Sequence, residues 1–236
     1  MRVIELHRTV TDSNDRQAEA LRRELTKKGV LLVNVMSSAG AGKTTLLTRL
    51  VKDMAGEVKV GVLEADLDSE VDAVRMEEAG AKSLQAHTDG MCHMDAGMTE
   101  AALAELGTGE LDLVFLENVG NLICPAEYDT GAQLKLMLLS VPEGDDKPLK
   151  YPLMFSESDI LVITKVDTLS WFDFDISRAS ERALKLNPKL RIFPVSAKTG
   201  EGMEDLETVL KERIREVKEA SRNAAESRNH EGGIKE

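Results

Sequence analysis

The stretch that most constrains the fold runs from Val30 to Leu47, with the sequence VLLVNVMSSAGAGKTTLL. Its first half is apolar and rich in β-branched residues, which predicts a buried strand. The strand runs into the small residues Ser37 to Gly42, after which Lys43 and Thr44 open a predicted helix. A strand, a glycine-rich loop, a Lys-Thr pair and a helix, in this order, are typical of a phosphate-binding P-loop.

The residue types in this loop suit a nucleoside triphosphate with its magnesium ion. Backbone N–H groups and the helix N-terminus would point at the phosphates. Lys43 would reach the β- and γ-phosphates, and the Thr44 hydroxyl would bind Mg²⁺. Ser37 stands where the general pattern has its first glycine, but a residue this small can still turn there. The alternative, a glycine-rich turn that binds nothing, is disfavoured by the placement of the Lys-Thr pair. The expected nucleotide contacts are Ala39, Gly40, Ala41, Gly42, Lys43, Thr44 and Thr45.

The composition excludes several classes of partner. The 236-residue chain has a net charge of −12 and only 3% aromatic residues, which disfavours nucleic acid, because phosphates need clustered cations and bases need stacking rings. No apolar run approaches the roughly 20 residues that span a bilayer, and the N-terminal segment has no apolar core of signal-peptide length. We therefore expect a cytoplasmic protein that binds neither nucleic acid nor membrane.

Strand-like and helix-like segments alternate along most of the chain. Beyond the first strand, strands are predicted at 58–64, 83–86, 111–116, 133–141, 159–164 and 190–195. Helices are predicted at 15–28, 70–78, 94–106, 175–186 and 203–217, with irregular chain over 1–14 and a loop over 142–152. This alternation predicts a three-layer α/β P-loop NTPase fold, or G-domain, with a mostly parallel central sheet and an N-terminal helix. The expected organisation is an N-terminal helical extension over 1–29, a P-loop GTPase domain over 30–217 and a flexible polar tail over 218–236.

Two further segments, each directly behind a predicted strand, suit a guanine base. In Thr164-Lys165-Val166-Asp167, the carboxylate of Asp167 could accept from the N1–H and the exocyclic amine of guanine. Backbone N–H groups of Ser196, Ala197 and Lys198 could contact the guanine oxygen. Together the segments resemble the NKxD and SAK elements of GTPases, with Thr164 in place of the usual asparagine. Ordinary charged loop ends are the alternative for the first segment taken alone.

The segment Glu117-Asn118-Val119-Gly120 stands where many GTPases have Asp-x-x-Gly. A carboxylate at Glu117 could hold the water shell of Mg²⁺, and the Gly120 N–H could meet a γ-phosphate. Loss of that phosphate would release the loop, which is how nucleotide switches work. Asp66 and Asp68 are candidates for a second carboxylate near the magnesium ion or the attacking water. The expected catalytic residues are Lys43, Asp66 and Glu117, and the expected magnesium ligands are Thr44, Asp66 and Glu117.

Cys92, His93 and Cys124 form a possible metal site. Two thiolates and an imidazole suit Zn²⁺ or Ni²⁺. Three ligands leave such a site one short, so water or a second subunit would complete it. Spacing alone favours the opposite interpretation, that the cysteines are small buried residues and the histidine lies at the surface, because the chain has no CxxC pair.

Several longer segments resemble the HypB-type GTPases, which help to deliver nickel to [NiFe]-hydrogenase. The segments are VNVMSSAGAGKTTLL, GMCHMDAGM, ENVGNLICPAEYDTG, SVPEGDDKPLKYPLMF, ITKVDTL, FDFDISRA and VSAKTGEGMEDL, between Val30 and Leu210. Residues 66–75 also resemble the family's GDxxTxxDxxR switch, with Ala65 and Ser69 as departures. Ala39, in place of a common proline, is another departure.

The resemblance implies a function and a set of ligands. It implies a slow GTPase that uses GTP or GDP with Mg²⁺, and a Ni²⁺ or Zn²⁺ site on Cys92, His93 and Cys124 at a nucleotide-dependent homodimer interface. The implied partners are a HypA-type nickel metallochaperone and the hydrogenase large subunit. The CxxCGC motif and the His-rich tract of some members are absent, so high-affinity N-terminal nickel binding is not implied. Two alternatives stay open: a metal-sensing GTP-binding regulatory module, and a urease-type nickel-maturation GTPase, although the Cys-Pro-His motif of UreG is not found.

Overall fold

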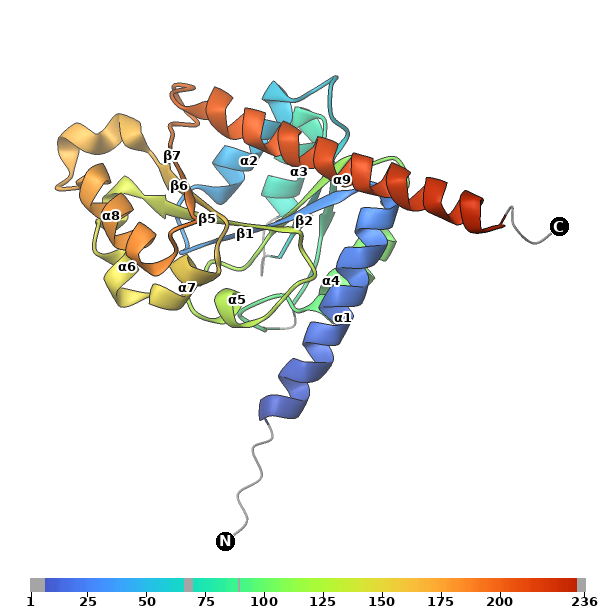
Figure 1. Ribbon diagram of the computed structural model, residues 1–236. Helices are drawn as coiled ribbons and strands as arrows, with labels where there is room; N and C mark the ends of the chain where they lie inside the picture. The colour runs from blue at the N-terminus through green and yellow to red at the C-terminus, as the bar shows by residue number, and fades with distance from the viewer. Residues whose placement is uncertain (1–6, 66–69, 89, 233–236) are drawn as a thin grey trace, which may run out of the picture.

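The central element of the fold is a parallel β-sheet. The computed structural model describes residues 7–65, 70–88 and 90–232. Within this part of the chain, seven parallel strands pair in the order β3-β2-β4-β1-β5-β6-β7 (Figure 1). They are β1 (Leu31–Ser37), β2 (Val60–Glu64), β3 (Lys82–Gln85), β4 (Leu113–Glu117), β5 (Leu134–Ser140), β6 (Ile160–Thr164) and β7 (Arg191–Pro194). The predicted three-layer α/β fold with a mostly parallel sheet is confirmed.

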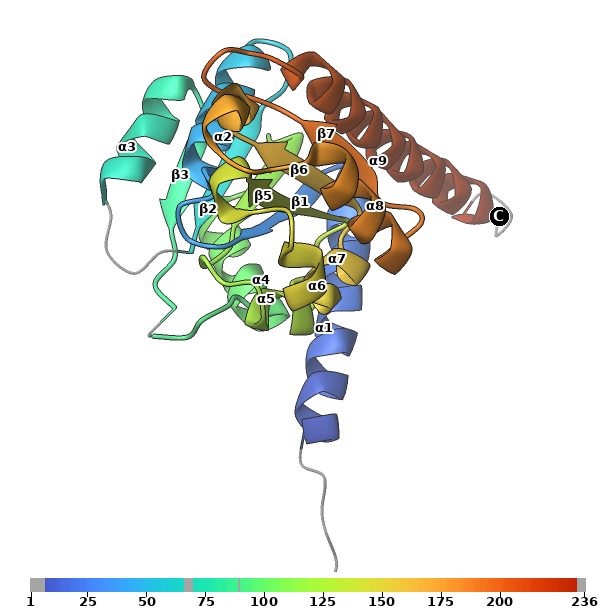
Figure 2. The same cartoon turned by 90° about the vertical axis from the view of Figure 1, so that its left-hand side faces the viewer.

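Helices cover both faces of the sheet (Figure 1, Figure 2). One face carries α2 (Lys43–Asp53), α3 (Glu70–Ala79) and α9 (Met203–Gly232), and the other carries α1 (His7–Lys28), α4 (Ala96–Leu106), α7 (Pro152–Glu157) and α8 (Ile176–Leu186). The short helices α5 (Cys124–Glu127) and α6 (Lys147–Lys150) and the 3-10 turns η1 (Val141–Glu143) and η2 (Val166–Trp171) lie in connections. In β1, Val33 packs under α2 while Leu32 packs on the α1 side, because successive side chains of a strand point to opposite faces. This explains why the strand is apolar on both faces.

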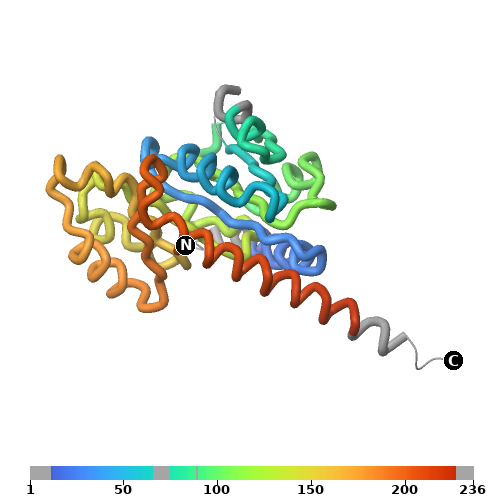
Figure 3. The backbone as a smooth tube through the Cα atoms, turned by 90° about the horizontal axis from the view of Figure 1, so that it is seen from above, coloured from blue at the N-terminus to red at the C-terminus, as the bar shows by residue number. Residues whose placement is uncertain are grey.

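The two terminal helices are longer than predicted. Residues 7–14, predicted as irregular, belong to α1, and α9 continues through residues 218–232, where the sequence analysis placed a flexible tail. Contacts with distant segments hold this part of α9: Lys218 Nζ lies 2.6 Å from Asp112 Oδ1, and the Ser221 hydroxyl donates to the Lys27 carbonyl at 2.6 Å. α9 therefore packs beside the C-terminal end of α1 and extends beyond the sheet (Figure 1, Figure 3). Among the described residues, no helix combines the length and apolarity of a membrane span.

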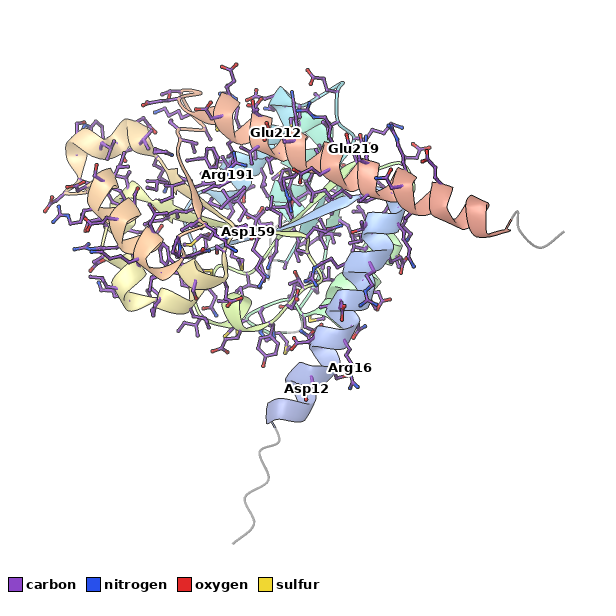
Figure 4. The ribbon with its side chains drawn as sticks, in the orientation of Figure 1. Asp12, Arg16, Asp159, Arg191, Glu212 and Glu219 are labelled. Carbon is purple, nitrogen blue, oxygen red and sulfur yellow. The ribbon has the colours of Figure 1, made fainter. Side chains whose placement is uncertain are left out.

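The parallel arrangement brings distant segments of the chain to one edge. The carboxyl ends of β1, β4 and β6 are Ser37, Glu117 and Thr164, each followed by a loop that the sequence analysis selected. The opposite edge is marked by Asp159 and Arg191, where the Arg191 N–H donates to the Asp159 carbonyl at 3.1 Å (Figure 4). The predicted 142–152 loop, beyond β5, contains the short helices η1 and α6.

Candidate nucleotide and metal site

The P-loop has the backbone geometry that an anion-binding loop requires. Gly40 and Gly42 have φ values of 76° and 96°, a left-handed conformation that favours glycine. Gly42 is the N-cap of α2, so the loop feeds directly into the positive end of that helix. A cavity of about 530 Å³ opens above the loop. Its lining consists of Ala39, Gly40, Gly42, Lys43, Thr44, Thr45, Ala65, Glu117, Asn118, Val119, Gly120 and Lys165.

Ser37, the departure from the general P-loop pattern, has a clear role. Lys43 is only 9% exposed, and its Nζ lies 3.2 Å from the Ser37 hydroxyl. That hydroxyl in turn donates to the Ser38 carbonyl at 2.7 Å. Ser37 therefore holds the lysine ammonium over the loop, which a glycine could not do.

Thr44 and Glu117 meet across the cavity. The Thr44 hydroxyl donates to Glu117 Oε1 at 2.9 Å, so a hydroxyl and a carboxylate converge where the magnesium ligands were expected. The predicted switch glycine, Gly120, lies against the P-loop: a Cβ built on it would be 2.9 Å from Ala39 Cα. Only a glycine allows this approach of two backbones. The other predicted carboxylates, Asp66 and Asp68, lie outside the described residues.

A second cavity of about 300 Å³ adjoins the first and shares Gly42, Thr45 and Lys165 with it. Its lining includes the predicted base-binding residues Asp167, Ser196, Ala197 and Lys198, together with Ala41, Leu46, Thr164 and Thr168. The Ser196 hydroxyl donates to Asp167 Oδ1 at 2.7 Å, which fixes the orientation of the carboxylate. The two cavities form one cleft, whose halves we name the phosphate half and the base half after the contacts that the sequence predicts for them.

Thr164 and Lys165 join the base half to the P-loop through hydrogen bonds that the sequence analysis did not predict. The Thr164 hydroxyl donates to the Ala41 carbonyl at 2.7 Å, and Lys165 Nζ donates to the Gly40 carbonyl at 2.7 Å. Lys165 itself adopts a left-handed backbone with φ of 61°. These bonds tie the TKVD segment to the P-loop, so the threonine braces the loop in place of the expected asparagine.

Glu143 was not selected from the sequence as a site residue. It hydrogen-bonds the Ser38 hydroxyl of the P-loop, and its other oxygen accepts from the backbone N–H of Ser140 at 2.8 Å. Ser140 and Glu143 form a capping box at the start of η1. The signal was present as a serine followed three residues later by a glutamate.

The structure brings Cys92, His93 and Cys124 together. Their ligand atoms all lie within 4.8 Å of one another, and Cys92 Sγ is 3.7 Å from His93 Nδ1. Two ligands about 2.3 Å from one metal ion can be at most about 4.6 Å apart, so small side-chain rotations would close this set on a metal ion. Spacing alone had favoured two small buried cysteines and a surface histidine, and both parts of that interpretation are wrong: Cys92 is exposed, Cys124 is half-buried, and His93 is only 7% exposed.

The environment of these side chains suits metal binding. Burial lowers the pKa of His93 despite the nearby Asp95 and Glu127, which keeps the imidazole neutral at pH 7. The His93 ring stacks on Tyr128 at 3.9 Å, a contact that the sequence analysis missed. His93 Nε2 is buried and makes no hydrogen bond to any residue that the structure describes. The pKa of Cys124 is raised by a hydrogen bond with Cys92 and by burial, so a metal ion would have to displace its proton.

Comparisons with known proteins agree with this geometry. Residues 31–194 match the family described as CobW/HypB/UreG, nucleotide-binding domain. The chain is 42% identical to the hydrogenase maturation factor HypB of Rhizobium leguminosarum bv. viciae over 203 residues, which cover 86% of this chain and 68% of that protein. The crystal structure of the maturation factor HypB from Archaeoglobus fulgidus superposes with a TM-score of 0.81 at 35% identity, covering 86% of this chain and 99% of that one.

A crystal structure of HypB from Helicobacter pylori in complex with nickel is also similar. It has a TM-score of 0.81 and 40% identity, covering 86% of this chain and 96% of that one. The matched region includes the P-loop, the switch segment at Gly120 and the TKVD segment. The chain belongs to the CobW/HypB/UreG family of P-loop nucleotide-binding proteins, among its HypB-type members.

Proposed function

We propose that this protein is a GTP-hydrolysing nickel metallochaperone that serves the maturation of [NiFe]-hydrogenase. The observation that carries the proposal concerns residues 117–124, a single segment that connects two sites. It begins at Glu117, which hydrogen-bonds the P-loop residue Thr44, and ends at Cys124, which lies with Cys92 and His93. A change in the bound nucleotide that moves this segment would therefore also move a metal ligand.

The roles of the nucleotide-site residues follow from their positions. Lys43 would contact the β- and γ-phosphates, and Asp167 would select guanine. Thr44, Glu117 and Asp66 would hold Mg²⁺, which supplies positive charge to the phosphates. The described residues that line the phosphate half include neither the arginine that stabilises the transition state of fast GTPases nor the glutamine that orients their attacking water. Hydrolysis should therefore be slow without a partner.

Nickel is the proposed cargo, held by two thiolates and an imidazole, a ligand set that also accepts Zn²⁺. The described part of one chain brings together three such ligands. A second copy related by two-fold symmetry would bring the same segments from the other side and complete the coordination. The proposed assembly is thus a homodimer favoured by GTP and by metal. It would receive nickel from a HypA-type metallochaperone and act on the hydrogenase large subunit in the cytoplasm.

Three measurements on the purified chain test the proposal: single-turnover hydrolysis of GTP and ATP, nickel content, and mass by light scattering with GDP or a GTP analogue. We expect hydrolysis of GTP alone, bound nickel, and a dimer with the analogue and nickel. A wild-type protein that binds no nickel, or that hydrolyses ATP as readily as GTP, would overturn the proposal. Nickel binding with hydrolysis that never affects it would favour the regulatory module instead.

A further inference from the structure

Asn118 occupies a central position between the two sites. It follows Glu117 at the end of β4, two residues before Gly120, and its backbone N–H donates to the Val35 carbonyl at 3.0 Å. Asn118 as a whole is only 1% exposed. A buried amide must make hydrogen bonds to offset its loss of water, so the partners of this side chain are informative.

Those partners lead directly to the metal ligands. Asn118 Oδ1 accepts from the backbone N–H of Met94 at 3.2 Å and from that of Val119 at 2.9 Å. Asn118 Nδ2 donates to Asn34 Oδ1 at 3.1 Å, and Asn34 is also 1% exposed. Met94 directly follows His93, so the amide joins the residue after the imidazole ligand to the middle of the sheet. This uses both ends of the amide, which an aliphatic side chain could not reproduce.

The nucleotide side of the same segment is tied to the P-loop. Glu117 accepts from Thr44 at 2.9 Å, and Gly120 lies against Ala39. Asn118 sits between these two contacts in the chain. A displacement of residues 117–120 when a γ-phosphate arrives or leaves would therefore move the side-chain oxygen of Asn118, Oδ1, and with it the Met94 N–H that donates to it.

We infer that Asn118 is a positioning residue that couples the nucleotide state to the metal site, an inference that rests on the proposed function. The loop following β4 holds Cys124 through the covalent chain and holds the Cys92–His93 segment through Asn118. Both segments that carry predicted metal ligands thus respond to the loop that follows β4. Without the amide, the loop would still move Cys124, but His93 would no longer follow it.

Asn14 provides a matched control. Its Nδ2 donates to the Asp129 carbonyl at 2.9 Å, and its Oδ1 accepts from the Ala96 N–H at 3.0 Å. Asn14 therefore ties the chain just beyond Cys124 and the chain just beyond His93 to α1, and not to residues 117–120. Loss of Asn14 should alter nickel affinity equally in both nucleotide states.

The experiment measures nickel affinity by competition with a chromophoric chelator, in the GDP state and in the GTP-analogue state. We expect the wild-type ratio of the two affinities to lie within the range of roughly 5–150-fold that is typical of coupled sites. Asn118→Ala should bring the ratio close to one while nickel still binds, and Asn14→Ala should keep the ratio. Asn118→Asp should also keep it, because a carboxylate still accepts from Met94 and the Asn34 amide can turn to donate to it.

A wild-type ratio in Asn118→Ala would overturn the inference and leave the proposed function intact, whereas a wild-type protein without nickel binding would remove the proposed function itself. Hydrogen exchange of the Met94 amide in the wild-type protein gives a test that needs no variant to fold. We expect its protection to differ between the GDP and GTP-analogue states. Equal protection in the two states would overturn the inference.

Discussion

The Thr164 hydroxyl donates a 2.7 Å hydrogen bond to the Ala41 carbonyl, across 123 positions of sequence. Thr164 is 5% exposed and Ala41 is fully buried, so water does not compete for this bond. The bond fixes the P-loop against the segment that carries Asp167. The phosphate and base halves of the cleft are thereby held at a set separation, which preorganises them for one nucleotide.

We expect Thr164→Val to weaken GDP and GTP binding about tenfold. Valine keeps the branched shape but leaves the buried Ala41 carbonyl without its donor, and such a loss costs on the order of 1–3 kcal/mol. Titration with a fluorescent guanine nucleotide measures the effect. Thr164→Ser, which keeps the hydroxyl, is the control and should bind nearly as well as the wild type. Wild-type affinity in Thr164→Val would show that the brace does not matter.

Asp167→Asn should shift the preference from guanosine to xanthosine nucleotides. The carboxylate accepts twice from the guanine edge, whereas an amide can accept once and donate once, which suits the additional oxygen of xanthine. The variant can retain the bond from Ser196, because its amide oxygen can still accept. Competition of GDP and XDP for the same site measures the change. Unchanged GDP affinity would contradict the guanine assignment.

Lys43→Ala should weaken triphosphate binding and abolish hydrolysis. The N-terminus of α2 supplies only about half a positive charge, which does not replace a full ammonium at the β/γ bridge. Lys59→Ala is a suitable control, because Lys59 lies at the opposite edge of the sheet with its Nζ 3.6 Å from Glu110. The control should keep wild-type hydrolysis, measured as phosphate release. Turnover by Lys43→Ala at the wild-type rate would refute the P-loop assignment.

The sequence predicted which segments meet at the cleft, because the pattern that marks each of these segments is local. A P-loop needs a strand, small residues and a Lys-Thr pair within a few positions, and the parallel sheet then aligns the other loops. The sequence analysis did not predict the buried hydrogen bond between Asn118 and Asn34. Asn34 interrupts an otherwise apolar strand, which was a visible signal, but its partner Asn118 lies 84 positions away. No periodicity shows which distant residue satisfies a buried amide.

The metal ligands and the terminal helices also depend on contacts between residues that are distant in sequence, which no local pattern reveals. Spacing alone disfavoured a metal site, because Cys92 and Cys124 are distant in sequence and only the fold joins them. The polar composition after Val217 predicted a flexible tail, whereas Ser221 bonds to Lys27 at the end of α1. Helices in proteins are stabilised mostly by tertiary packing, so the composition of one helix does not reveal that another helix stabilises it.

The last prediction concerns the pH dependence of nickel binding. The pKa of Cys124 is raised above its ordinary value by a hydrogen bond with Cys92 and by burial, so near neutral pH the metal-free protein carries this proton. Nickel binds the thiolate, and the proton must leave. Affinity should therefore rise with pH, and Cys124 alone should contribute about one decade per pH unit between about pH 7 and 8. His93 adds little in this range, since burial lowers its pKa and leaves the imidazole already neutral. Chelator competition across this range should show a slope about one unit smaller in Cys124→Ala than in the wild type, and an unchanged slope would mean that Cys124 does not bind the metal.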